Sequence, residues 1–108
     1  MAAQAQDGKL VRDRIPDIIR QDGGEPVTTV LSGPDYQVAL RAKLQEEVDE
    51  LLAAPLESFP EELADVLEVL RSLAAVSGLD WDALDGLRAT KRAERGGFDG
   101  RVWLVSSH

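Results

Sequence analysis

The sequence predicts a single all-α domain of four helices. A small pair of strands could also form beside them. Its length of 108 residues suits one small domain, and a composition of 44% apolar and 30% charged residues is typical of a globular chain. Apolar residues recur three and four positions apart through most of the chain, which is the spacing of one helix face. Residues 1–8 lack this periodicity, so we expect a flexible tail there and a single domain over residues 9–108.

A short first helix is expected between Asp13 and the glycine pair 23–24. Its three isoleucines are spaced three and four positions apart and form a narrow apolar stripe. Pro16 suits the first turn of a helix, where a missing N–H costs little, and Asp13 is the candidate N-cap. The two glycines favour the end of the helix.

Two long helices are expected next, joined as a hairpin. The second helix begins near Ser32 and keeps helical apolar spacing over residues 36–54. The third begins at Ser58, which forms a capping-box pattern with Glu61, and continues to Gly78 at its C′ position. Because the connection is short, the two helices should be antiparallel. Two helices of about 20 residues leave a 108-residue chain little core, so we expect a dimer that shares a helical core.

A fourth helix and the strand pair complete the prediction. The helix is expected from a cap at Asp80 to the glycine pair 96–97. Residues 27–31 are β-prone, and residues 98–105 carry apolar side chains in a strand-like alternation. These two segments could pair with each other.

The composition excludes several classes of function. The chain has 12 Lys and Arg against 20 Asp and Glu, and its net charge of −8 disfavours nucleic acid and anionic membranes as partners. It has no Cys, and its one His is the last residue, which argues against disulfides, thiolate nucleophiles and His-dependent metal sites. With no signal peptide and no apolar run of about 20 residues, a cytoplasmic location is expected.

The negative charge is concentrated in residues 44–70, which contain nine carboxylates and no Lys or Arg. Four of them form two pairs with a spacing of three residues, Glu47 with Glu50 and Glu62 with Asp65. In an antiparallel hairpin, 47 faces 65 and 50 faces 62, so the four carboxylates converge. Oxygen ligands without His or Cys suit Mg²⁺ or Mn²⁺. A solvated acidic face is the alternative interpretation.

Four segments of the chain carry motifs in a fixed order: KLVRDRIPDII (9–19), KLQEEVDELL (43–52), EELADVLEVL (61–70) and KRAERGGF (91–98). Together they resemble the all-α nucleoside triphosphate pyrophosphohydrolases, a superfamily that includes the MazG proteins, the dimeric deoxyuridine triphosphatases and phosphoribosyl-ATP pyrophosphohydrolase. They are most similar to the short MazG-like proteins related to phosphoribosyl-ATP pyrophosphohydrolase. The resemblance covers about residues 9–104 and implies the four-helix MazG-like fold as a dimeric helical bundle.

The resemblance also implies a reaction, in which an NTP or dNTP and water give NMP and pyrophosphate by cleavage between the α and β phosphates. Dependence on Mg²⁺, or Mn²⁺ in its place, and a homodimer or dimer of dimers are expected with it. Carried over onto this chain, the metal ligands are Glu47, Glu50, Glu62 and Asp65. The catalytic residues are Glu46 and Glu47, with Glu46 as a further ligand or as the group that orients the attacking water.

Basic residues beside these motifs are candidates for binding the substrate phosphates: Lys43, Lys91, Arg95, Lys9 and Arg12. Lys43 lies one turn before Glu47, and Lys91 and Arg95 share a face near the end of the fourth helix. The alternative for that pair is to complement the negative end of the helix dipole.

The resemblance implies a role in nucleotide-pool sanitation. Two further functions stay open beside it. One is phosphoribosyl-ATP pyrophosphohydrolase of histidine biosynthesis, which shares the carboxylate signature, although the start KLVRDRIP fits the MazG-like proteins better. The other is a non-catalytic nucleotide-binding helical dimer with a regulatory role. An intact carboxylate set favours an enzyme over this second alternative.

Overall fold

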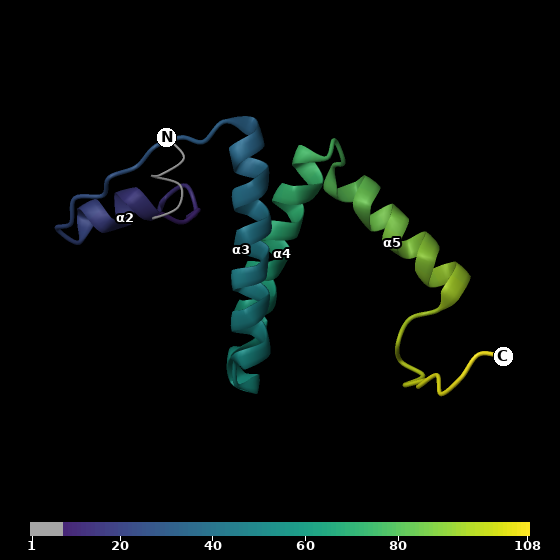
Figure 1. Ribbon diagram of the computed structural model, residues 1–108. Coiled ribbons are helices and arrows are strands. Elements are labelled where there is room, and N and C mark those ends of the chain that lie inside the picture. The colour runs from purple at the N-terminus through teal and green to yellow at the C-terminus, as the bar shows by residue number, and fades with distance from the viewer. Residues whose placement is uncertain (1–7) are drawn as a thin grey trace.

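The computed structural model describes residues 8–108 and confirms the all-α class (Figure 1). The elements are α2 (Ile15–Gln21), α3 (Gly33–Ala53), the 3₁₀ turn η1 (Leu56–Ser58), α4 (Phe59–Val76) and α5 (Trp81–Arg95). These α-helices are the four that the sequence predicts. Of the expected N-terminal tail, residues 1–7 lie outside the described residues.

The α3–α4 hairpin is the centre of the molecule and confirms the predicted antiparallel pairing (Figure 1). Its turn is only Ala54–Pro55 and η1, so the two helices run back along each other. The buried apolar residues are Leu40 on α3 and Val69 and Ala74 on α4. Leu67 and Leu70 on α4 are exposed, so the apolar residues of this helix are only partly buried.

The N-terminal caps follow the predicted signals at two of the four helices. The Ser32 hydroxyl accepts from the Asp35 N–H at 3.3 Å, and the Asp80 carboxylate accepts from the Ala83 N–H at 2.8 Å. Gly78, just after α4, has φ +82°, a conformation that glycine adopts without strain.

The other two caps are corrections to the sequence prediction. Asp13 does not cap α2, because the Ile15 N–H already donates to the Arg12 carbonyl at 3.0 Å and Arg14 becomes the N-cap residue. Ser58 does not form a capping box, because η1 leaves it in helical conformation with φ −94° and ψ −5°. A cap needs extended backbone at this position.

The strand pair is also a correction, since residues 8–108 contain no strand. Residues 27–31 lead into the start of α3, whereas residues 98–105 follow the far end of α5, and Figure 1 shows them on opposite sides of the hairpin. Val27 and Val30 are 99% and 97% exposed. An extended segment without a neighbour has no ladder of hydrogen bonds to hold it as a strand.

The C-terminal helix α5 leaves the hairpin at an angle and contacts only α4 among the described elements (Figure 1). The guanidinium of Arg71 lies 5.4 Å from the ring centre of Trp81 and ties the start of α5 to α4. The radius of gyration is 18.0 Å, whereas a compact domain of this length has about 13 Å. None of the helices within residues 8–108 is both long and apolar enough to span a membrane.

Candidate metal centre and adjoining cleft

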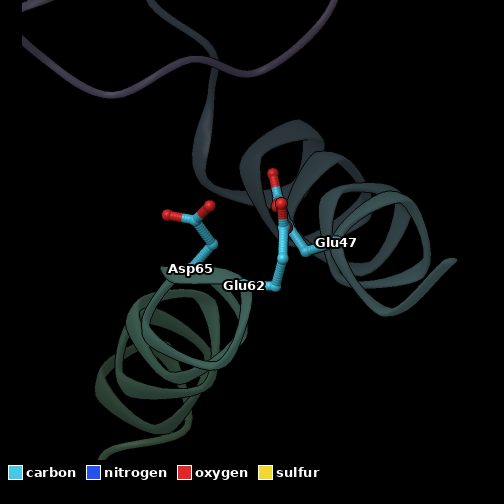
Figure 2. Close-up of side chains that lie close together, drawn as sticks. All are labelled: Glu47, Glu62 and Asp65. Carbon is cyan, nitrogen blue, oxygen red and sulfur yellow. The ribbon is translucent and has the colours of Figure 1, made fainter. Parts of the chain in front are cut away.

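Three carboxylates from the two hairpin helices meet at one point. Glu47 comes from α3, while Glu62 and Asp65 lie one helical turn apart on α4. One oxygen of each lies within 4.8 Å of the other two. Figure 2 shows the three side chains extending from their helices into the same space. The predicted convergence is therefore confirmed for three of the four carboxylates.

Two oxygens of this group are buried without a donor. Glu47 is only 7% exposed, and its Oε2 finds no hydrogen-bond partner within the described part of the chain. The same holds for Oε2 of Glu62. A buried carboxylate oxygen without a donor is costly, and a hard cation satisfies such an oxygen. The donor set, all oxygen and partly buried, fits Mg²⁺ or a similar divalent ion.

Glu50 is the member of the predicted quartet that does not join the group. It is exposed and stands outside the three carboxylates whose oxygens meet. Its pKa is nevertheless raised, mainly by the negative charge of Glu47, with desolvation and the charges of Glu62 and Glu46 adding to the effect. The negative charge of the group therefore acts on Glu50, although Glu50 is not one of the three carboxylates that meet.

Two cationic side chains hold the outer oxygens of the same carboxylates. Lys43 Nζ lies 3.2 Å from Glu47 Oε1 and 3.4 Å from Glu46 Oε1. Burial alone would lower the pKa of Lys43, but hydrogen bonds and charge from both glutamates outweigh it and raise that pKa. Arg12 Nη2 lies 2.8 Å from Asp65 Oδ1. This side of the group therefore carries two cations beside the carboxylates.

A cleft of 420 Å³ opens beside the three carboxylates. It is lined by residues 10–14 of the N-terminal segment, by α3 from Tyr36 to Glu47, and by α4 from Asp65 to Ser72. Arg12 and Lys43 line it together with Glu47 and Asp65. Carboxylates that can hold a cation and cations that can hold phosphate therefore share one cleft.

The other predicted residues lie outside this cleft in a single chain. Glu46 is half-buried and pairs with Lys43 at its edge. Lys9 is exposed and does not line the cleft, although its neighbour Leu10 does. Lys91 and Arg95 are exposed on α5, which has no contact with α3 among the described elements. Within one copy, the structure does not bring them to the carboxylates.

Some cleft residues carry little signal in the sequence. Arg14 belongs to the same basic segment as Arg12, and that segment is the signal available for it. From the helical spacing, Tyr36 belongs to the apolar positions of its helix and Ser72 lies between such positions. Glu68 is one of several acids on α4. Only the packing of the N-terminal segment against the hairpin distinguishes them.

Comparison with known proteins identifies one relative over part of the chain. A protein of Mycolicibacterium smegmatis (strain ATCC 700084 / mc(2)155), described as an uncharacterized protein, is 59% identical over 46 residues, or 43% of this chain and 47% of that protein. The matched region spans about half the length of that relative. No family model and no solved structure matches this chain. The superfamily suggested by the motifs stays a prediction.

Proposed function

We propose that this protein is a Mg²⁺-dependent nucleoside triphosphate pyrophosphohydrolase that cleaves the α–β phosphoanhydride, giving a nucleoside monophosphate and pyrophosphate. One observation carries the proposal: three carboxylates meet, two of them with a buried oxygen lacking a donor, and two of the three, Glu47 and Asp65, line a cleft that Arg12 and Lys43 also line. Such a combination suits a triphosphate bound together with a divalent cation. The resemblance of the four motifs supports the same reaction. Its role would be the removal of non-canonical or surplus nucleotides in the cytoplasm.

The carboxylates divide into those that would bind the cation and one that would accept a proton. Glu47, Glu62 and Asp65 would hold the cation, and Glu50, on the same helix as Glu47, could approach once the charge of the group is offset. Bound Mg²⁺ supplies Lewis acidity, lowers the pKa of water and offsets the charge of the triphosphate. Glu46 is half-buried at the edge of the group, where it could orient the attacking water and accept its proton.

The cations of the cleft would bind the substrate phosphates. Lys43 forms ion pairs with Glu46 and Glu47, and Arg12 forms one with Asp65. When a cation occupies the carboxylates, these ion pairs compete with it and weaken, which leaves Lys43 and Arg12 available for phosphate oxygens. The chain's own charges therefore favour binding of nucleotide and cation together.

Lys91, Arg95 and Lys9 keep a proposed phosphate role only if another copy or a movement of α5 brings them close. We propose a homodimer or dimer of dimers as the working form. In one copy only Leu40, Val69 and Ala74 form the buried apolar core of the described residues, and the radius of gyration of 18.0 Å exceeds that of a compact domain. A second copy would cover the exposed leucines of α4.

The test is a panel of NTPs and dNTPs, with phosphoribosyl-ATP included, assayed for pyrophosphate release with and without Mg²⁺. We expect pyrophosphate and the matching monophosphate from at least one nucleotide, only with the divalent ion. Release from phosphoribosyl-ATP alone would assign the reaction to histidine biosynthesis. Nucleotide binding in calorimetry without turnover of any compound would instead support the regulatory dimer.

The variant that links this activity to the site is Asp65→Asn. We expect turnover to fall by at least about a hundredfold, because loss of a direct ligand costs no less than loss of a supporting residue. Asp49→Asn is the matched control, since Asp49 is exposed on α3 and accepts a hydrogen bond from Gln45 at 2.9 Å. Wild-type turnover in Asp65→Asn, with the fold intact, would rule out its ligand role.

A further inference from the structure

A groove between α4 and α5 leaves an apolar surface open in the described part of the chain. It has a volume of 670 Å³ and is lined mainly by apolar side chains, among them Leu67, Leu70, Leu73, Trp81 and Leu84. Leu67 and Leu70 remain 44% and 39% exposed there. Contiguous apolar surface of this kind marks a contact site in a folded protein.

The segment after α5 is the second unpartnered apolar feature. Phe98, Val102, Trp103, Leu104 and Val105 are between 74% and 96% exposed. Five large apolar side chains within eight residues are unfavourable to leave in water, since burial of each would stabilise the folded protein. We call residues 98–105 the C-terminal tail.

Groove and tail do not meet within one copy. The groove lies where α4 ends and α5 begins, and the tail follows the opposite end of α5. A helix of 15 residues is about 22 Å long. The segment after α5 contains a turn in which the Arg101 N–H donates to the Phe98 carbonyl at 3.0 Å. Figure 1 shows this segment at the end of α5 that is farther from α4.

The charge at the end of α5 favours a second copy as the partner. Residues 86–108 contain five Lys or Arg and two Asp or Glu, whereas residues 44–70 contain nine acids and no Lys or Arg. When the end of α5 and the tail of one copy lie along α4 of another, positive charge meets the acidic hairpin. The same contact covers both apolar features.

We propose that the C-terminal tail of one copy lies in the α4–α5 groove of a second copy, and reciprocally. A two-fold exchange of this kind fills each groove and leaves no tail exposed. The inference rests on the homodimer of the proposed function and is independent of its chemistry.

The test uses the absence of native cysteine from the chain. Trp103→Cys and Leu70→Cys are made as separate, differently tagged variants, mixed, and treated with a short bismaleimide. We expect a cross-linked pair of unlike copies. Tail variants Phe98→Cys and Val105→Cys are paired with Leu70→Cys in the same way, so that the result does not depend on one register. Val38→Cys, 68% exposed on α3, is the control partner and should give no product.

Each other outcome overturns the inference. Cross-linking only within a Trp103→Cys, Leu70→Cys double variant would show that the tail folds back into its own groove. No product in either arrangement would show that the groove does not hold the tail. Sedimentation of the same samples separates this failure from that of the dimer, because a protein that dimerises without cross-linking keeps the dimer and loses the exchange.

A cysteine-free variant provides an independent readout. Trp103→Ser with Leu104→Ser should lower the dimer association constant by roughly tenfold or more, because the burial of either side chain outweighs a factor of ten. Val27→Ser removes a side chain that is 99% exposed and lies outside both surfaces, so association should not change. Unchanged association in the tail variant, with helical content intact, would contradict the proposal.

Discussion

The α3–α4 hairpin and the C-terminal arm, α5 with the residues after it, differ in how much they bury alone. Within residues 8–108, every buried residue, Leu40, Glu47, Val69 and Ala74, lies in the hairpin, and none of those from Trp81 onward is buried. The hairpin therefore holds its own geometry, and the arm depends on contacts from elsewhere. The candidate metal site, which needs fixed carboxylates, lies in the first region, and the exposed apolar tail lies in the second.

The hairpin also buries a charge where a purely structural helix pair would bury an apolar residue. Glu47 occupies a core position between Leu40 and the turn, held by Lys43 on one oxygen only. An arrangement that gives up packing at this point is expected at a functional site. The arm has no buried charge among its described residues, and its five Lys or Arg and four Asp or Glu are all exposed.

The largest expected difference between the two regions is in stability. Leu40→Ala should lower the free energy of unfolding by about 2–5 kcal/mol, because Leu40 is 3% exposed and its loss leaves a cavity. Leu87→Ala should cost less than about 1 kcal/mol in dilute protein, since Leu87 is 53% exposed. Urea unfolding followed by circular dichroism checks both, and equal effects would remove the distinction between the regions.

A smaller effect distinguishes two ion pairs of equal length. Arg12–Asp65 and Arg20–Asp17 are both 2.8 Å long and exposed, so neither Arg→Ala change should alter stability by more than about 1 kcal/mol. Only Arg12 lines the cleft. Arg12→Ala should raise KM for the nucleotide by about tenfold, the value of one charge-assisted hydrogen bond. The same KM in both variants would remove Arg12 from the substrate site.

The smallest predicted effect is a pH dependence from Glu50. Its pKa is raised above the ordinary value of 4.5 in the folded state by the charge of Glu47. Below the ordinary pKa, Glu50 is protonated in both the folded and the unfolded state and does not lower the free energy of unfolding. As the pH rises from that value through the raised folded pKa, Glu50 ionises and the free energy of unfolding falls. Thermal unfolding across this range should show a shallower fall in Glu50→Gln than in the wild type, and the exposed Glu57→Gln should follow the wild type. A parallel profile for Glu50→Gln would contradict the coupling.

Much of the hairpin could be predicted from local spacing. Because helix periodicity and a short turn fix the register, the sequence alone is enough to place Glu47, Glu62 and Asp65 together. The exception is Glu50, whose position three residues on leaves it at the exposed side of the group. The register of two antiparallel helices shows which residues face each other, but it does not determine the direction of a flexible side chain.

The remainder of the fold depends on tertiary contacts that spacing does not encode. The cap at Ser58 is lost to the preceding 3₁₀ turn, and the strand pair is lost because its two segments lie on opposite sides of the hairpin. Lys91 and Arg95 match the motif, but the angle at which α5 leaves α4 keeps them away from the cleft of their own copy. Arg14 and Tyr36 line the cleft only because the N-terminal segment packs against α3.

The most direct test of the metal centre is titration calorimetry of the purified protein with Mn²⁺ and Mg²⁺, for the wild type, Glu62→Gln and Glu61→Gln. Glu62 belongs to the carboxylate group, whereas Glu61, its neighbour on α4, is exposed outside it. We predict saturable binding in the wild type and Glu61→Gln, and an affinity lower by at least about a hundredfold in Glu62→Gln. Folded wild-type protein without saturable binding, or Glu62→Gln with wild-type affinity, would contradict the metal centre.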